Sequence, residues 1–303
     1  MIAMLQELRD RQLEQWPMAC ANYERLGETL RRSFDAGPLH GAFQYNPARI
    51  VSTSAKVDKE SIGKRPCFLC AANRPTEQLS EEILPGWEFL INPFPIFPLH
   101  FTIASSTHRP QDEIPLEMAS MAERLRGMTV FFNGARAGAS APDHLHCQAV
   151  ATFELPLMRY LEEGGDPALL PFRVDYRVIT PDLAGMAALN EISSVAGVDR
   201  QTGEADPRLV NAYFWIGADG LLRAAVVRRS AHRPSCYPGG GAVEAGSSKS
   251  LMVSPGAIDM AGVVVLPRRE DFDAISDSDI RLIYSEVALA PVNSQTAVSD
   301  EGK

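Results

Sequence analysis

The chain has 303 residues, of which 45% are hydrophobic and 22% charged, a composition typical of folded globular proteins rather than disordered ones. Its 29 basic and 38 acidic side chains give a net charge of −9, which argues against nonspecific nucleic-acid binding, since that requires clustered Lys and Arg. No run approaches the roughly 20 apolar residues of a membrane span, and residues 1–16 are charged where a signal peptide is apolar. Five cysteines in this length indicate a reducing, cytoplasmic compartment.

The first half alternates helical and strand patterns. Apolar residues recur at helical spacing over residues 4–34, and Pro17 should break this run into two amphipathic helices. Residues 42–57 and two apolar runs within 87–110 predict strands, and residues 113–127 predict a helix. Residues 128–153 predict a strand, a Gly/Ala/Ser loop and a second strand.

The second half also contains both strand and helix patterns. Asp219-Gly220 between two apolar runs predicts a β-hairpin, and residues 237–250 predict a Gly/Ser-rich loop. A buried strand and a helix near 276–290 should follow. Together these elements predict an α+β fold, with an antiparallel sheet flanked by helices. The length exceeds what one hydrophobic core usually fills, so we expect a helical segment (1–36) and two lobes (37–155 and 156–303).

Three polar residues alternate in the segment DHLHCQ: His144, His146 and Gln148. On a β-strand all three would project from one face, with Cys147 turned into the core. Imidazole and amide N–H groups can hold a phosphoryl group, and the preceding small residues would let backbone N–H groups approach an anion. The spacing alone leaves open a structural cluster with satisfied hydrogen bonds.

The segment NGARAGASAPDHLHCQ resembles the active-site segment of the histidine triad superfamily, in the branch of galactose-1-phosphate uridylyltransferases and diadenosine tetraphosphate phosphorylases. RPCFLCAAN and LINPFPIFPLHFTIASSTHRPQ extend the resemblance upstream, and NPARIVSTSAK matches more loosely. The resemblance covers roughly residues 42–150. It implies a HIT-like antiparallel sheet and a nucleotidyltransferase activity.

The resemblance also implies roles for individual residues. His146 would be the nucleophile, and Gln148 would hold the phosphoryl group. The nucleotide and its phosphate would contact Leu69, Asn92, Phe94, Asn133, Gly138 and Ser140. Ser140 lies four residues before His144, one more than in the family pattern, which makes Asp143 an insertion.

The chemistry of these residue types favours transfer over hydrolysis. A neutral imidazole is nucleophilic at pH 7, whereas a glutamine in the third position cannot shuttle a proton and so suits an acceptor that is already anionic. The resemblance therefore implies a nucleotide-sugar or dinucleoside polyphosphate as donor, and phosphate or a sugar phosphate as acceptor. The alternatives are a zinc-stabilised nucleotide-binding or regulatory module without turnover, and a HIT-type hydrolase. Base, sugar and oligomeric state stay open, although uridylyltransferase-like proteins are often homodimers.

Cys67 and Cys70 form a Cys-x-x-Cys pair in a Pro-flanked loop. No thioredoxin-like pattern surrounds the pair, which leaves two unrelated thiols or half of a metal site. In zinc-containing uridylyltransferases the other two ligands are histidines, and the resemblance places these at His108 and His144. A closed set of two cysteines and two histidines is typical of structural zinc.

Four basic residues follow the predicted hairpin: Arg228, Arg229, His232 and Arg233. They predict either a solvated basic end of the hairpin or a contact from the second lobe to the phosphate of the second substrate. The sequence does not decide between the two.

Overall fold

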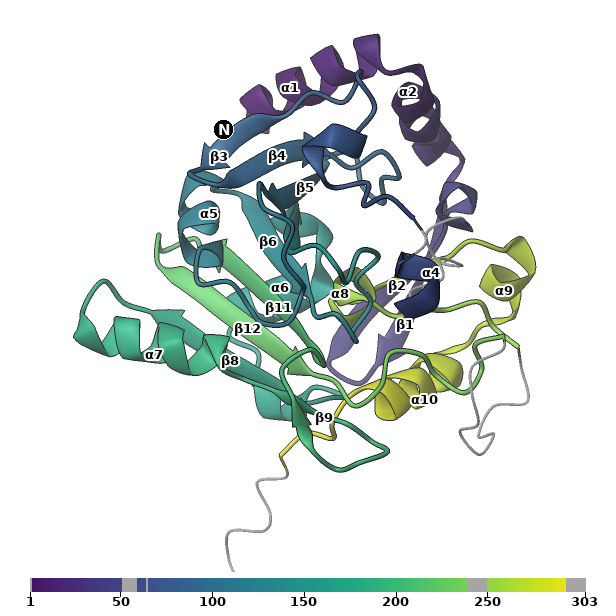
Figure 1. Cartoon of the computed structure of the whole chain (residues 1–303). Helices are drawn as coiled ribbons and strands as arrows, with labels where there is room; N and C mark the ends of the chain where they lie inside the picture. Colours follow the sequence, from purple (N-terminus) through teal and green to yellow (C-terminus); the bar gives the residue numbers. More distant parts are fainter. Residues whose placement is uncertain (1, 51–58, 64, 239–249, 293–303) are drawn as a thin grey trace, which may run out of the picture.

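The computed structural model describes residues 2–50, 59–63, 65–238 and 250–292. At its centre lies an eight-stranded sheet in which every neighbouring pair is antiparallel (Figure 1). In spatial order its strands are β3 (Glu81–Leu84), β4 (Trp87–Ile91), β5 (His100–Ser105), β7 (His146–Ala151), β6 (Met128–Asn133), β11 (Val210–Ile216), β12 (Leu222–Arg228) and β8 (Val174–Ile179).

Smaller elements surround this sheet. A three-stranded sheet contains β1 (Leu30–Ala36), β2 (Leu39–Tyr45) and β13 (Val263–Leu266), and β13 runs parallel to β2. The short strands β9 (Gly197–Val198) and β10 (Ala205–Asp206) pair with each other. Short helical segments are η1 (Arg25–Glu28), η2 (Pro47–Arg49), α4 (Lys59–Gly63), η3 (Ala71–Asn73), η4 (Thr152–Glu154) and η5 (Pro167–Leu169).

Both faces of the eight-stranded sheet are buried, because side chains that alternate along each strand enter two separate cores. Val130 and Phe132 pack on the side covered by α1 (Ile2–Gln15), α2 (Pro17–Glu24), α5 (Met118–Arg124) and α7 (Leu183–Ser193). Phe131, between them in sequence, packs on the opposite side. That side is covered by the three-stranded sheet and by α6 (Pro156–Glu162), α8 (Ala257–Met260), α9 (Arg269–Ala274) and α10 (Asp277–Val287).

The predicted α+β class is confirmed, as are the hairpin and several strands. Gly220 adopts φ +81° in the turn between β11 and β12, as a Gly in such a turn can without strain. The large sheet continues across the predicted boundary after residue 155, since β6 pairs with β11. The division into two lobes stays a prediction.

Three predicted boundaries were wrong. The N-terminal helical pattern ends at Glu28, and Leu30 begins β1 instead of closing a helix. Pro17 does separate two helices, and it occupies the start of α2, where its missing N–H costs nothing. The strand predicted over 42–57 ends at Tyr45, because Pro47 cannot donate to a ladder and starts η2. The helix predicted over 113–127 is limited to α5.

Other predicted segments lie outside the described residues in whole or in part. These are residues 51–57 of the predicted strand and most of the 237–250 loop. The predicted helix near 276–290 is α10.

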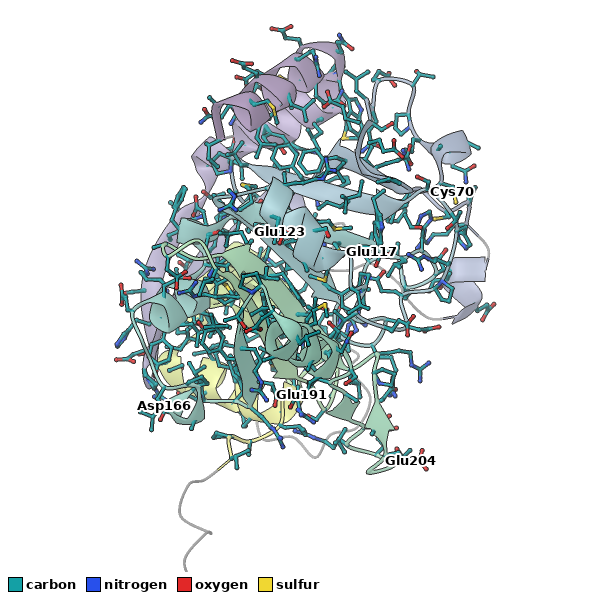
Figure 2. All side chains as sticks on the ribbon, turned by 90° about the vertical axis from the view of Figure 1, so that its left-hand side faces the viewer. Cys70, Glu117, Glu123, Asp166, Glu191 and Glu204 are labelled. Atoms are coloured by element: carbon teal, nitrogen blue, oxygen red, sulfur yellow. The ribbon has the colours of Figure 1, made fainter. Side chains whose placement is uncertain are left out.

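The acidic side chains lie largely on the surface. Figure 2 shows Glu123 on α5, Glu117 directly before that helix, and Glu191 on α7. Within the described ranges, no helix combines the length and apolar character needed to cross a bilayer.

The close contact at Gly41 provides a test of the packing of β2. A Cβ at this position would lie 2.2 Å from Cζ of Phe34 and 2.5 Å from the carbonyl oxygen of Gly262. We expect Gly41→Ala to lower the free energy of unfolding, measured in urea, by about 1–3 kcal/mol through overpacking. Gly27→Ala is the matched control, because nothing lies within 4 Å of its Cβ. Equal stability of the two variants would contradict this packing.

Candidate active site and metal centre

The ends of β6 and β7 are joined by the side chain of Gln111, which is fully buried. Its Nε2 donates to the carbonyl oxygens of Asn133 and His146, each at 2.8 Å. Its Oε1 accepts the backbone N–H of His146 at 2.7 Å. Gln111 therefore fixes where β7 begins. Sequence reasoning missed it, because a single glutamine after a proline belongs to no pattern.

Hydrogen bonding fixes the tautomer of His146. Its Nδ1 lies 2.8 Å from the carbonyl oxygen of His144, and since a carbonyl can only accept, Nδ1 carries the proton. Burial lowers the pKa of His146 to about 4, so the ring is neutral at pH 7. The Nε2 lone pair is then available, and within the described structure no hydrogen-bond donor occupies it.

Gln148 projects from the same face of β7 as His146, and its amide is also oriented. Nδ1 of His100 accepts the backbone N–H of Ile96 at 3.1 Å, so the neutral ring carries its proton on Nε2. That Nε2–H donates to Oε1 of Gln148 at 2.8 Å, and Nδ2 of Asn92 donates to the same oxygen at 3.2 Å. The amide nitrogen of Gln148 is left as the donor toward the cavity described below.

Hydrogen bonds to protein donors also orient the side-chain amide of Asn133. Its Oδ1 accepts the backbone N–H of Ala257 at 2.7 Å and Nδ2 of Asn211 at 2.9 Å. Because a backbone N–H can only donate, the accepting atom must be the oxygen. The amide nitrogen of Asn133 is therefore turned away from these partners.

These side chains line one cavity of about 600 Å³. The structure brings together in its wall every catalytic and nucleotide-contacting residue expected from the sequence: Leu69, Asn92, Phe94, Asn133, Gly138, Ser140, His146 and Gln148. Sequence reasoning did not place several further lining residues, which come from elements distant in the chain: Trp16, Met18, Gln78, Ser254 and Asp259. Their types are common everywhere in proteins, so no sequence pattern marks them.

Two features of position 138 require a glycine: its backbone conformation and the close approach of a neighbouring segment. It adopts φ +99°, and a Cβ there would lie 2.7 Å from Cα of Gly256. The loop between β6 and β7 thus lies directly against the segment that precedes α8. Residues from both halves of the chain meet at this point of the cavity.

The four basic residues after the hairpin have different surroundings. Arg228 pairs with Asp175, with Nε and Oδ2 2.5 Å apart, in a separate hollow of about 310 Å³ between α7 and β8. Arg229 is fully buried outside both hollows. His232 and Arg233 line the large cavity, together with Arg49.

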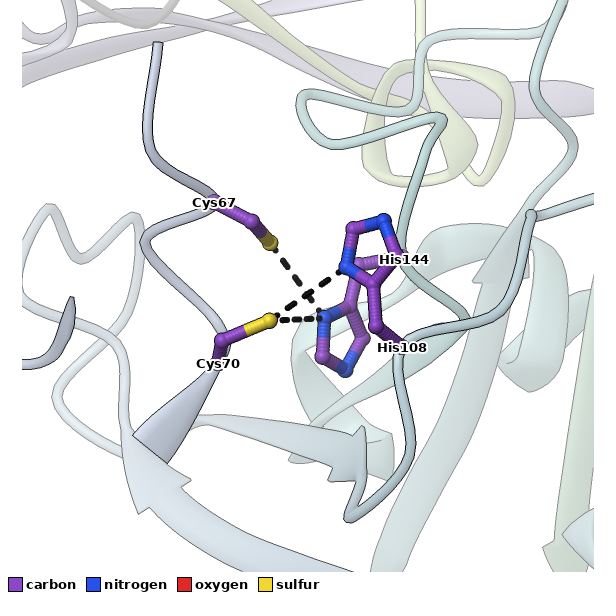
Figure 3. A group of neighbouring side chains, drawn as sticks. All are labelled: Cys67, Cys70, His108 and His144. Carbon is purple, nitrogen blue, oxygen red and sulfur yellow. Dashed lines mark hydrogen bonds between the residues drawn. The ribbon is translucent and has the colours of Figure 1, made fainter. Parts of the chain in front are cut away.

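A second cluster lies near the cavity and contains the four predicted metal ligands, Cys67, Cys70, His108 and His144 (Figure 3). Their ligand atoms all lie within 4.8 Å of one another. Nδ1 of His144 is 3.3 Å from Sγ of Cys67 and 3.5 Å from Sγ of Cys70, and Nδ1 of His108 is 3.3 Å from Sγ of Cys70. Tetrahedral zinc with usual bond lengths needs S···N separations of about 3.6 Å. The group can hold a metal ion.

The hydrogen bond of His144 supports this fit. Its Nε2 donates to the carbonyl oxygen of Ser105 at 2.8 Å, which leaves the Nδ1 lone pair facing both thiols. One expectation was wrong: His144 precedes β7 and does not share the strand face of His146 and Gln148. Cys147 packs in the core as expected.

Comparison with known proteins bears on the fold. Residues 8–151 match a family described as a domain of unknown function (DUF4922). No curated protein matches the sequence significantly. The yeast Ap4A phosphorylase Apa2 in complex with Ap4A superposes with a TM-score of 0.62 at 14% identity, over 95% of this chain and 99% of that chain. Apa2 in complex with AMP superposes at 0.57, with 13% identity, over 94% and 99%. At this identity the likeness shows a shared fold.

Buried neutral histidines should make the stability fall in mild acid. Burial and nearby arginines lower the pKa of His100 and of His232 to about 3, whereas an unfolded histidine titrates near pH 6.5. Between these values the unfolded state binds more protons, so the free energy of unfolding should fall as the pH drops below about 6.5, by up to about 1.4 kcal/mol per pH unit per group.

Urea unfolding at several pH values measures this slope. We expect His232→Gln to flatten it, and His40→Gln, a change at an exposed position of β2, is the control. A slope that is identical in wild type and His232→Gln would contradict the assignment.

Proposed function

We propose that this chain is a nucleotidyltransferase or phosphorylase that acts on a nucleotide-sugar or dinucleoside polyphosphate through a covalent nucleotidyl-His146. The orientation of His146 carries the proposal, because its unprotonated Nε2 lines a cavity of about 600 Å³, the size typical of small-molecule sites. The fold shared with a phosphorylase that binds Ap4A and AMP supports it. So does the resemblance of residues 133–148 to the histidine triad active-site segment.

The reaction would proceed in two displacements. Nε2 of His146 attacks the α-phosphorus, and an N–P bond forms while the bond from phosphorus to the bridging oxygen breaks. The bridging oxygen keeps the electron pair and departs as part of a phosphorylated leaving group. An oxygen of phosphate or of a sugar phosphate then attacks the same phosphorus, and the N–P electron pair returns to the imidazole.

The amide donors would stabilise the charge that develops on the phosphoryl oxygens. Asn133 and Gln148 each have their side-chain oxygen bound by protein donors, so each offers only N–H to the cavity. Such fixed donors need no reorganisation when charge develops. Neither amide can accept a proton from water, which favours acceptors that are already anionic.

The apolar wall would hold the base of the nucleotide. Leu69 and Phe94 lie there with Trp16, Met18, Leu90 and Pro93. Apolar contacts of this kind discriminate weakly among bases. We therefore propose the class of donor and not its base.

We further propose that Cys67, Cys70, His108 and His144 hold a structural zinc ion. The ion would supply a fixed anchor for the segment that leads into β7, since a closed set of four protein ligands leaves no position for substrate. This chain contributes two thiols and two Nδ1 lone pairs to the site, with the His144 ring held by Ser105. His146 lies two residues beyond His144, so the ion would restrain the nucleophile through the backbone.

The covalent step can be tested by mass spectrometry of the protein incubated with a panel of nucleotide-sugars and dinucleoside polyphosphates. We expect the mass of the protein to increase by that of a nucleoside monophosphate less one water, and the nucleotidyl group to be transferred to phosphate or to a sugar phosphate. His146→Ala should abolish both the adduct and turnover, because Nε2 of His146 supplies the nitrogen of the N–P bond. His40→Ala, a change at an exposed position of β2, is the control.

The outcomes separate the alternatives. Near wild-type transfer by His146→Ala would overturn the mechanism. Nucleotide binding without adduct by the wild type would favour a binding module, and release of nucleoside monophosphate without an acceptor would favour a hydrolase.

The metal site can be tested by elemental analysis of the purified protein and by thiol titration. We expect about one zinc per chain, with Cys67 and Cys70 reacting only after a chelator is added. Cys70→Ser should lose most of the zinc, and Cys20→Ser, on α2 away from the cluster, should keep it. Well under one zinc per chain, with all five thiols free, would exclude the site.

A further inference from the structure

Arg229, the residue that follows β12, is a fully buried cation with every N–H group occupied. Nε donates to Val287 at 2.9 Å, and the two Nη2 bonds reach Ala231 and His232, each at 3.1 Å. Nη1 donates to Pro255 at 3.0 Å and to Oδ1 of Asn211 at 2.6 Å. Four of the five acceptors are backbone carbonyls, so Arg229 has no donor left for a substrate.

The fifth acceptor, Oδ1 of Asn211, connects Arg229 to a residue that lines the cavity. Asn211 uses its Oδ1 for Arg229, so its Nδ2 must be the donor, and it lies 2.9 Å from Oδ1 of Asn133 and 2.8 Å from the carbonyl oxygen of Ala137. Asn211 lies directly opposite Asn133 in the pairing of β11 with β6. A continuous chain of donors therefore runs from Arg229 through Asn211 to Asn133, all in one direction.

We infer that Arg229 and Asn211 are positioning residues that hold the amide of Asn133 with its N–H₂ group toward the α-phosphate of the nucleotide. The inference rests on the proposed function, because it takes the cavity to bind a nucleotide phosphate. It assigns to two residues of the C-terminal half a role at a site whose motifs all lie in the N-terminal half.

The electrostatics agree with this role. None of the five acceptors of Arg229 is a carboxylate, so its charge is not cancelled by a hydrogen-bonded counterion. Burial lowers the pKa of Arg229 only to about 10, so the guanidinium is charged at pH 7. Hydrogen bonds aligned in one direction polarise each other, so the charge strengthens the donor at the end of the chain.

Without Asn211 and Arg229 the Asn133 amide would be held less firmly. In that case only the backbone N–H of Ala257 would hold its oxygen. If the amide turned, its carbonyl oxygen would face the phosphate and repel it. The series of hydrogen bonds from Arg229 through Asn211 to Asn133 should therefore raise the affinity for a phosphate-bearing ligand and not the affinity for the nucleoside alone. This difference in affinity can be measured.

The test compares the affinities of a nucleoside and its 5′-monophosphate by isothermal titration calorimetry, using adenosine, guanosine and uridine with their monophosphates. Asn211→Asp keeps the pairing with Arg229, but it places a carboxylate against Oδ1 of Asn133. Asn211→Leu removes the donor without adding charge. In both variants we expect the preference for the monophosphate over the nucleoside to fall about ten- to a hundredfold, with nucleoside affinity unchanged.

Thr129→Val is the matched control. It removes another buried side-chain hydrogen bond of β6, from Thr129 to Thr152 at 3.1 Å, without touching the chain of donors. The control should keep the wild-type preference. A preference retained in both Asn211 variants would overturn the inference, and so would a loss in Asn211→Asp alone, which would mean that added charge was responsible.

An equal loss of nucleoside and monophosphate affinity in both variants would show a merely structural role and also overturn the inference. If the wild type itself shows no preference for any monophosphate, the proposed function fails rather than the chain of donors. The two failures are therefore distinguishable.

Discussion

The carbonyl oxygen of His144 lies 2.8 Å from Nδ1 of His146, and this contact governs the chemistry of the cavity. It places the proton on Nδ1 and leaves the lone pair on Nε2. The same residue, His144, turns its own ring toward Cys67 and Cys70 and donates from Nε2 to Ser105. A three-residue segment thus connects the Cys/His cluster to the candidate nucleophile, so a displacement at either end would change the position of the other.

The other polar side chains are oriented in the same way. A backbone group that can only donate or only accept a hydrogen bond determines the orientation of the side chain that it contacts. The N–H of Ile96 determines the tautomer of His100, and the Nε2–H of His100 in turn determines the orientation of the Gln148 amide. The N–H of Ala257 and the side-chain amide of Asn211 together orient the amide of Asn133. The cavity therefore presents neutral imidazole and amide N–H groups beside the side chains of Arg49, Arg65 and Arg233. This explains how a chain of net charge −9 can offer a favourable surface to an anion, since Asp259 is the one acidic residue among the described residues that line the cavity.

Much of the site could be predicted from sequence because its motifs are short. His146 and Gln148 share a strand, and Cys67 and Cys70 share a loop, so spacing alone brings each pair together. Gln111 and Asn211 could not be found in this way, and Arg229 was singled out only as one of four basic residues whose role the sequence left open. Each contacts the site through a pairing of strands or loops far apart in the chain, and each is of a residue type that is ordinary on a surface. The strand boundary at Tyr45 was missed because the ladder ends at Pro47, where apolar residues continue but the N–H donor does not.

The pairing of β6 with β11 has a consequence for how the protein folds during its synthesis. β6 is an inner strand only because β11 covers its far side, and about 75 residues separate the two in the chain. During synthesis, the backbone groups of Val130–Asn133 would therefore remain an open edge until residues 210–216 leave the ribosome. The candidate nucleophile and the candidate metal ligands are made early, yet the edge beside them is exposed to association with other chains for that interval. A chaperone that shields this edge would act at the same place where the folded chain completes the cavity.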